Sequence, residues 1–304
     1  MPQQSPSLQS RILRVVWSRL TARAGSFASI QEMRAAQERW LNRPFLPRGV
    51  TRQKVTAGGV PAEWLIPAAA AAHGVLLYLH GGAWTLGWYE PRRWLVGHLA
   101  RATGQRALAL DYRLAPEHPF PAALEDCLAA YRWLLSSGTR PEQILIAGDS
   151  AGGNLTLTTM IALREGGEPL PAAGVCLSPV TDLAGTGQAA PPHPDPGLPA
   201  DWAGEQSRSY LGDTDPRLPL VSPYRANLHG LPPLLIQVGG DEFLLSDANR
   251  FASKARTAGV DVTLQVWPGM WHVWQILVGL MPESNQAVDA IGAFSRQHLA
   301  RQGT

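Results

Sequence analysis

The chain has 304 residues, of which 45% are hydrophobic and 16% charged, and its formal net charge is +2. This composition supports a globular core, and a charge so close to zero argues against a nucleic-acid-binding surface. The length fits one or two domains, and a single α/β domain with insertions often reaches it. Cys127 and Cys176 lie in apolar runs and are predicted to be buried rather than joined in a disulfide.

The sequence contains no Cys or His cluster with the spacing of metal ligands, so no metal and no other cofactor is predicted. The first residues, Met1–Ser10, are polar, and no uninterrupted apolar segment has the quality of a signal peptide or a membrane span. We therefore expect a cytoplasmic protein that does not bind nucleic acid and does not insert stably into a membrane.

The pattern from Ser5 to about Arg43 predicts two amphipathic helices. We expect both helices to pack on the main body through their apolar residues. The arginines of the first helix leave a membrane-surface helix open as an alternative. The apolar residues of the two helices are Ile12, Val15, Val16 and Leu20, then Ile30, Met33, Ala36 and Trp40.

Residues 44–47 form a linker, and residues 50–56 and 60–66 predict two strands joined in a hairpin at Ala57-Gly-Gly. After a surface connection at 68–72, strands and helices alternate, and the strands are apolar on both faces. This alternation indicates an α/β fold with a mostly parallel sheet covered on both sides. The expected strands are 75–79, 107–110, 144–147, 174–177, 234–238 and 262–266, and the expected helices are 92–102, 121–136, 151–164, 244–257 and 283–301.

The stretch Leu183–Ser222 breaks this alternation and is rich in Pro, Gly and Asp. A loop of this length is expected to be functional or to carry short helices of its own.

A candidate nucleophile lies in Gly148-Asp-Ser-Ala-Gly152, between the strand at 144–147 and the helix at 151–164. The turn of a Gly-x-Ser-x-Gly motif is strained and needs small flanking residues, which Gly148 and Gly152 supply. Ser150 would therefore stand at the end of a sheet and over the N-terminus of a helix, where developing negative charge is favoured.

A serine nucleophile needs a base, and the base needs an acid that orients it. His272 lies in a loop directly after a late strand, whereas His193, His229 and His298 have less suitable positions. Asp241 directly follows the strand at 234–238 and its glycine turn, and is the predicted acid. Alternative acids are Glu242, Asp247 and Asp182. The order Ser150, Asp241, His272 is that of α/β-hydrolases.

Acyl transfer also needs donors for the oxyanion. The segment Tyr78-Leu-His-Gly-Gly-Ala-Trp84 ends an apolar strand with small residues, whose backbone N–H groups can face a ligand. The predicted oxyanion hole comprises Gly81, Gly82, Ala83 and Ala151.

Together these motifs resemble the hormone-sensitive-lipase-like carboxylesterases, the bacterial α/β-hydrolases with HGGG and GDSAG motifs. The likeness runs from about residue 60 to the C-terminus. It rests on His80-Gly-Gly-Ala83, Asp111-Tyr-Arg-Leu-Ala-Pro-Glu-His118, Gly148-Asp-Ser-Ala-Gly152, Gly239-Gly-Asp241 and His272.

The resemblance implies an eight-stranded α/β-hydrolase core, formed here by residues 46–182 and 221–304. It also implies a cap built from residues 1–45 and from an insertion at 183–220, a preference for short acyl chains, and frequent homodimers. By the family pattern Asp241 is the acid, while Glu117 and His118 belong to a structural signature. Two departures are Ala83 in place of the third glycine and Glu242 in place of the usual proline.

The expected activity is hydrolysis of short- to medium-chain carboxylic esters through an acyl-enzyme. Tryptophans near the motifs indicate an aromatic substrate pocket formed by Trp84, Trp88, Trp271 and Trp274. Alternatives are hydrolysis of amides, carbamates or lactones by the same triad, an interfacial lipase with the first helix as a lid, and a small-molecule receptor with a disabled site.

Overall fold

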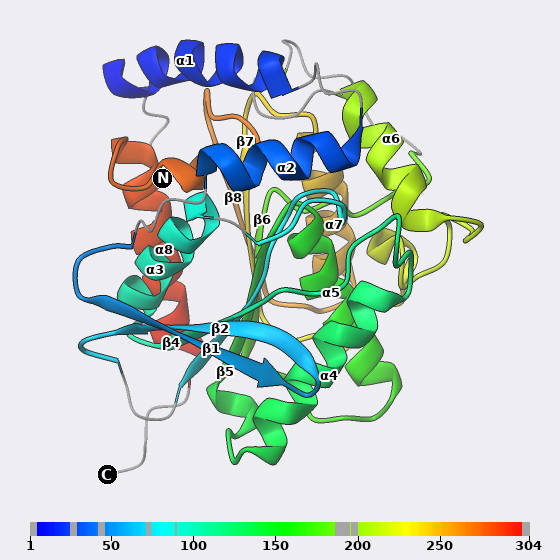
Figure 1. Ribbon diagram of the computed structural model, residues 1–304. Helices are drawn as coiled ribbons and strands as arrows, with labels where there is room; N and C mark the ends of the chain where they lie inside the picture. Colours follow the sequence, from blue (N-terminus) through cyan, green and yellow to red (C-terminus); the bar gives the residue numbers. More distant parts are fainter. Residues whose placement is uncertain are drawn as a thin grey trace.

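An eight-stranded sheet runs through the centre of the protein (Figure 1). The computed structural model describes residues 5–24, 29–41, 46–70, 74–88, 90–185, 195 and 200–299. The sheet order is β1-β2-β4-β3-β5-β6-β7-β8, in which β1 and β2 pair antiparallel, β2 and β4 pair antiparallel, and all later pairs are parallel. The strands are β1 (Val50–Ala57), β2 (Val60–Pro67), β3 (Val75–Leu79), β4 (Arg106–Leu110), β5 (Ile144–Asp149), β6 (Ala173–Leu177), β7 (Leu234–Gly239) and β8 (Val262–Trp267).

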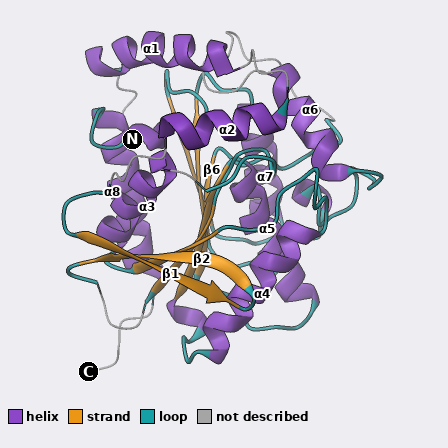
Figure 2. Ribbon diagram, viewed as in Figure 1, coloured by secondary structure: helices purple, strands orange, loops and turns teal. Residues whose placement is uncertain are grey.

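Helices cover both faces of the sheet (Figure 2). Because side chains alternate along a strand, Leu77 of β3 packs in the cluster with α4, α5 and α7, whereas Leu76 packs with α3 and α8. The predicted α/β fold with an eight-stranded, mostly parallel sheet is therefore confirmed. The helices are α1 (Leu8–Ala24), α2 (Ile30–Leu41), α3 (Glu90–Thr103), α4 (Ala122–Ser136), α5 (Ala151–Glu165), α6 (Ala200–Leu211), α7 (Leu245–Thr257) and α8 (Pro282–His298).

Most predicted elements agree with these bounds to within a few residues. Cys127 and Cys176 are both free and buried, as predicted. The predicted linker at 44–47, the connection at 68–72 and the end of the last helix at 301 lie partly outside the described residues. Within the described ranges, no helix has the length and apolar character needed to cross a bilayer.

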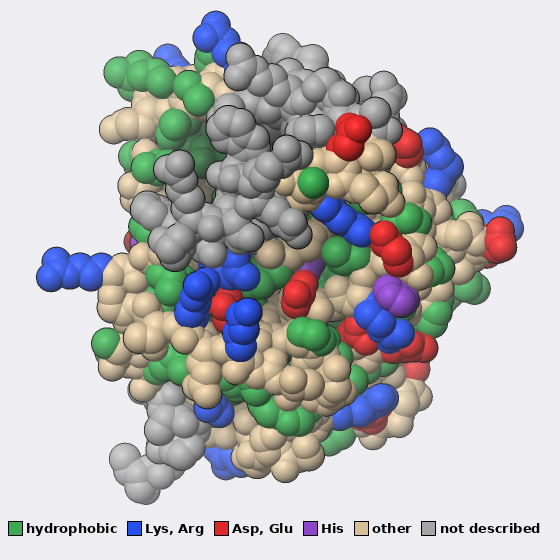
Figure 3. Space-filling view, in the orientation of Figure 1, with side chains coloured by type: hydrophobic (Ala, Val, Ile, Leu, Met, Phe, Trp, Pro, Cys, Tyr) green, Lys and Arg blue, Asp and Glu red, His purple; other side chains and the backbone are tan. Residues whose placement is uncertain are grey.

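Helices α1, α2 and α6 lie together at one end of the strands (Figure 1). We call α1, α2 and the described part of residues 183–220 the cap segments. Both predicted N-terminal helices are present, but the expected inward face of α1 is wrong. Ile12, Val15 and Val16 are 56%, 51% and 46% exposed, and hydrophobic side chains gather over α1 in Figure 3.

The inward face of α1 instead carries Leu13 and Trp17, which pack against a tryptophan-rich cluster, and Arg14. The helix thus has apolar residues on two sides, and the side with Leu13, Trp17 and Arg14 faces the body. The α2 residue Met33 is buried, as predicted.

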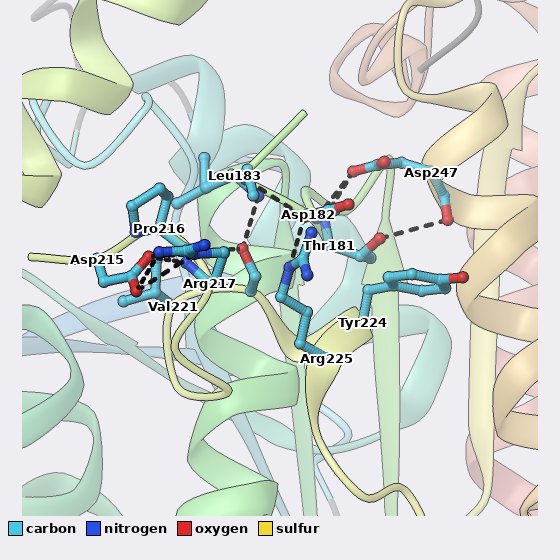
Figure 4. A network of polar contacts seen from close by, with 12 residues as sticks. Thr181, Asp182, Leu183, Asp215, Pro216, Arg217, Val221, Tyr224, Arg225 and Asp247 are labelled. Atoms are coloured by element: carbon cyan, nitrogen blue, oxygen red, sulfur yellow. Dashed lines mark hydrogen bonds and ion pairs between the residues drawn. The ribbon is translucent and has the colours of Figure 1, made fainter. Parts of the chain in front are cut away.

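The two ends of the 183–220 stretch are joined at their base by buried polar groups (Figure 4). The Asp247 carboxylate accepts from the N–H groups of Thr181 and Asp182, at 2.9 and 3.1 Å. The fully buried Asp182 forms ion pairs with Arg225 and Arg250, each at 3.3 Å. On the other side of the base, the Ser222 hydroxyl accepts from the N–H of Leu183 at 2.7 Å and donates to the carbonyl of Pro216 at 2.6 Å.

Candidate active site

Ser150 occupies a strained turn between β5 and α5. Its backbone has φ 53° and ψ −116°, a conformation that costs energy for a residue with a side chain. Neither flanking glycine has room for a side chain. A Cβ on Gly148 would lie 2.2 Å from the carbonyl oxygen of Gly152, and one on Gly152 would lie 1.9 Å from that of Leu79. The predicted need for small residues here thus follows from backbone contact between strand, turn and helix.

His272 lies on the turn that follows β8 and meets Ser150 directly. The Ser150 hydroxyl donates to His272 Nε2 at 2.9 Å, and both side chains are buried. The imidazole is therefore within reach of the proton that a serine nucleophile must lose.

The second nitrogen of His272 faces Glu242. His272 Nδ1 lies 3.5 Å from Glu242 Oε1, and the Glu242 side chain is fully buried. The other oxygen, Oε2, accepts from the Ser178 hydroxyl and from the N–H of Gly239, each at 2.7 Å. These two donors fix the carboxylate, which in turn selects the imidazole tautomer that carries its proton on Nδ1.

Asp241, the predicted acid, makes contacts with residues other than His272. Its carboxylate pairs with Arg14 of α1 and is about a quarter exposed, and its N–H donates to the carbonyl of Met270 at 2.9 Å. The side chains of Asp241 and Glu242 leave the turn after β7 in different directions, and it is Glu242 that contacts the imidazole. The other two alternative acids, Asp182 and Asp247, belong to the network in Figure 4.

The surroundings of His272 raise its pKa above the ordinary value. Burial alone lowers the pKa, because it disfavours the imidazolium. The hydrogen bond and charge of Glu242 act in the opposite direction, and the charges of Asp195 and Asp149 add to them. The net effect is stabilisation of the protonated base by three carboxylates.

The segment after β3 is held by the residue that precedes the nucleophile. Asp149 Oδ1 accepts from the Gly81 N–H at 2.8 Å and from the Tyr78 hydroxyl at 2.7 Å. Because the Gly81 N–H donates to Asp149, it is not available to an oxyanion, although Gly81 was among the predicted donors. A Cβ at Gly81 would also lie 2.3 Å from Asp149 Oδ2, so glycine is required for this approach.

His80 orients the next peptide group. It is fully buried, stacks on Tyr112 with ring centroids 4.1 Å apart, and has its pKa lowered to about 3, chiefly by burial. The neutral ring donates from Nδ1 to the Gly81 carbonyl at 2.7 Å. Because the peptide is trans, the N–H of Gly82 points away from His80.

Gly82 and Ala83 both have positive φ, 113° and 51°. In the described part of the chain, we find no acceptor for the N–H groups of either residue. Ala151 is the first residue of α5, where the helix itself supplies no acceptor. Three of the four predicted oxyanion donors are thus available for a ligand.

Residues 76–276 match the family described as having the alpha/beta hydrolase fold, which is more than half of the chain. The acetyl-hydrolase of Streptomyces hygroscopicus is 46% identical over 244 residues, 80% of this chain and 81% of that protein. A crystal structure of an esterase from the bacterial hormone-sensitive lipase family has a TM-score of 0.89 and 41% identity, over 98% of this chain and 100% of that one. This chain belongs to the hormone-sensitive-lipase-like α/β-hydrolases.

The predicted family is thereby confirmed, and the hydrolase is a carboxylic ester hydrolase. A crystal structure of EstE5 soaked with p-nitrophenyl butyrate is also similar to this hydrolase. It has a TM-score of 0.89 and 38% identity, and the match covers 97% of this chain and 100% of that one.

The tryptophans of the hydrolase contribute mostly to packing. Trp84 stacks on Tyr210 with centroids 4.2 Å apart, next to the predicted oxyanion donors. Trp88 donates to Glu63 at 3.0 Å. The last two predicted pocket residues, Trp271 and Trp274, are fully buried in the cluster that receives α1. The structure therefore places Trp271 and Trp274 in the core and Trp88 half-buried against it, and Trp84 lies next to Ala83.

Four residues of the site were missed by sequence reasoning. Asp149 lies inside the GDSAG motif, so its proximity could have been noticed. Ser178 follows β6, the strand next to β7, and a polar residue at that sheet edge was also a usable signal. Nothing in the sequence pairs Arg14 or Asp195 with the turns that carry Glu242 and His272, because each belongs to a cap segment far away along the chain.

Proposed function

We propose that Ser150, His272 and Glu242 form the catalytic triad of an esterase that works through an acyl-enzyme. The observation that carries this proposal is the relay of contacts from the Ser150 hydroxyl to His272 Nε2 at 2.9 Å and from His272 Nδ1 to Glu242 at 3.5 Å. In apo structures such hydrogen bonds are often longer than in the substrate complex.

In the acylation step, His272 takes the Ser150 proton while the serine oxygen attacks the ester carbonyl. Glu242 stabilises the resulting imidazolium and keeps its orientation, without taking the proton itself. The N–H groups of Gly82, Ala83 and Ala151 bind the oxyanion, and such a donor is worth about 3–4 kcal/mol in a protease. The imidazolium then protonates the leaving alcohol.

In the deacylation step, His272 removes a proton from water, and the hydroxide attacks the acyl-serine. The second tetrahedral intermediate uses the same donors, and collapse returns the proton from His272 to Ser150. Every step uses groups of this chain, with the ester and water as the reactants.

For the substrate we propose esters with short to medium acyl chains. Trp84 and Tyr210 stack as one buried aromatic wall beside Ala83, which limits the room next to the scissile carbonyl. The similar protein of Streptomyces hygroscopicus is named an acetyl-hydrolase, and the EstE5 crystals were soaked with a butyrate ester. Both names fit a small acyl group.

The test is hydrolysis of p-nitrophenyl esters from C2 to C16 by the wild-type protein and by Ser150→Ala. We expect fast turnover that peaks at short chains and falls by roughly 10³–10⁶-fold in the variant. The matched control is Ser136→Ala, at an exposed serine of α4, which should keep full activity.

Other outcomes would select the alternatives. A peak at long chains, with a rate jump at the solubility limit of the substrate, would favour an interfacial lipase. If the protein hydrolyses none of these esters but turns over an anilide, a carbamate or a lactone, the alternative of amide, carbamate or lactone hydrolysis is favoured. Activity that survives in Ser150→Ala would contradict the proposed nucleophile.

We also propose that the cap segments cover the site as a separate layer, with the core at residues 46–182 and 221–304. The predicted cytoplasmic location and the predicted homodimer stay predictions. Light scattering on the purified protein would test the homodimer.

A further inference from the structure

Two turns carry the acid and the base of the proposed triad. We call residues 239–243 the acid turn and residues 267–273 the base turn. Within the core they are joined by two backbone hydrogen bonds, from the N–H of Gly240 to the carbonyl of Trp267 at 2.8 Å and from the N–H of Asp241 to that of Met270 at 2.9 Å. The Glu242–His272 contact spans the same pair of turns.

Asp195, a cap residue from the 183–220 stretch, bridges the two turns from outside. Its Oδ2 accepts from the N–H of Phe243 at 3.1 Å, and its Oδ1 accepts from the N–H of His272 at 3.3 Å. One carboxylate therefore holds the residue after Glu242 and the base itself.

Arg14, a cap residue from α1, bridges the same turns a second time. Its guanidinium pairs with the carboxylate of Asp241 and donates to the carbonyl of Gly269 at 3.2 Å. Asp241 and Phe243 are the two neighbours of Glu242. The two cap residues thus bind the acid turn at the residues directly before and after Glu242.

The helix that carries Arg14 is itself fixed to the core. The N–H and the hydroxyl of Ser7 donate to the carboxylate of Glu283 in α8, at 2.6 and 3.0 Å. Trp17, one turn after Arg14, packs against the buried tryptophan cluster under the base turn. Arg14 is therefore a fixed bridge between α1 and the two turns.

We propose that Asp195 and Arg14 are positioning residues. Through them, two separate cap segments hold the acid and base turns in the relative position that keeps Glu242 in contact with His272. This proposal rests on the proposed function, because it assigns the Glu242–His272 contact a role in turnover. That contact, at 3.5 Å, is the longest link of the relay and so responds most to a shift between the turns. A misplacement of about 1 Å can cost about 100-fold in rate.

The experiment compares Asp195→Asn and Arg14→Gln with matched controls from the same segments. Asparagine has one acceptor oxygen and a donor in place of the second, so it can bridge only one of the two N–H groups. The controls are Asp213→Asn and Arg11→Gln, which change exposed side chains of the 183–220 stretch and of α1. Arg14→Lys keeps the charge and tests for partial rescue.

We expect kcat for p-nitrophenyl acetate to fall roughly tenfold in Asp195→Asn and in Arg14→Gln, with KM little changed. The groups that face His272 are Glu242, Asp195, Asp149 and the Ser150 hydroxyl. Loss of the Asp195 charge removes one source of the raised pKa of His272. The acid limb of kcat/KM should therefore move to lower pH in Asp195→Asn, which a general loss of stability would not cause.

Each variant is assayed below the melting temperature that circular dichroism gives for it, so that a less stable variant still yields a result. Unchanged kcat and acid limb in Asp195→Asn would overturn the proposal, as would a rise in KM with kcat unchanged. If Ser150→Ala keeps its activity, the proposed function fails instead. Loss of activity in Ser150→Ala, with Asp195→Asn equal to Asp213→Asn, would refute the positioning role alone.

Discussion

The turn that carries Ser150 and the cap segments around the other two residues of the proposed triad are held by different kinds of contact. The Ser150 turn is set by backbone packing around Gly148 and Gly152 and by the buried Asp149. The cap segments contact the acid and base turns through the charged side chains of Arg14 and Asp195, and the Arg14 side chain is 28% exposed. The position of Ser150 is therefore fixed by local backbone packing. The positions of the acid and base turns also depend on cap contacts, which a small movement of the cap can break.

Arg34 of α2 also contacts the core through a charged side chain, next to the segment that carries the predicted oxyanion donors. It donates to the carbonyls of Thr85 and Ala115, each at 2.7 Å, and pairs with Glu117 at 2.9 Å. This ion pair gives Glu117 a structural contact, in keeping with what the family resemblance implies for the Asp111–His118 signature. Each of the three cap segments thus contacts a loop next to the site.

The largest effect that would sharpen this comparison is expected from Gly152→Ala. The added methyl group would meet the Leu79 carbonyl at 1.9 Å, and backbone cannot rotate away from it. We expect a loss of about 3 kcal/mol or more in the free energy of unfolding, at the upper end for overpacking, with activity lost as well. Urea denaturation measures this.

The control is Gly204→Ala in α6, a cap helix. Among the described residues beyond its neighbours and its own helix backbone, the added group meets only the Arg208 side chain within 4 Å, at 3.9 Å, and alanine favours a helix more than glycine. Stability should stay equal or rise by up to about 1 kcal/mol. Equal losses in the two variants would contradict the contrast between a packed nucleophile turn and a tolerant cap.

A smaller effect is expected from Asp149→Asn. The change removes the carboxylate that accepts from Gly81 and Tyr78 and that lies 3.6 Å from Arg92. Hydrogen bonds to a charged group contribute about 1.5–3 kcal/mol, so we expect a loss of that size in unfolding free energy. The segment after β3 that carries the proposed oxyanion donors Gly82 and Ala83 should also loosen, which lowers kcat. Asp289→Asn, on the exposed side of α8, should change neither quantity.

The smallest effect is expected from Glu117→Gln, on the cap side. The Glu117 carboxylate is 45% exposed, and an ion pair in such a position contributes less than about 1 kcal/mol. We expect the melting temperature to fall by only about 2 °C and kcat to stay within about twofold. A loss as large as that of Asp149→Asn would show that α2 is held more firmly than its exposure indicates.

The sequence was sufficient for those parts of the fold and site that depend on local patterns. The strands apolar on both faces predicted the sheet, and the positions of Ser150 and His272 after strands predicted their meeting at its carboxyl edge. The acid could not be decided in this way. Asp241 and Glu242 both follow β7, and the choice depends on Ser178 and Arg14, which come from distant parts of the chain.

The orientation of α1 escaped prediction for a related reason. Its apolar residues form two faces, and a periodicity argument chose the one with Ile12, Val15 and Val16. The native choice brings Leu13 and Trp17 inward, together with an arginine that finds its partner only in the folded protein. Local pattern cannot supply such a long-range ion pair.

The most direct test of the account compares Glu242→Gln with Asp241→Asn in the pH dependence of kcat/KM for p-nitrophenyl acetate. The raised pKa of His272 predicts that the wild-type rate falls as the pH drops through a value above about 6.5, the ordinary pKa of histidine. Glu242→Gln should lower kcat by roughly 10³–10⁴-fold, by analogy with the loss of a triad carboxylate, and move this acid limb to lower pH. Asp241→Asn should lose no more than roughly tenfold, through its contact with Arg14, and keep the limb in place. The reverse order of the two variants would contradict Glu242 as the acid of the triad.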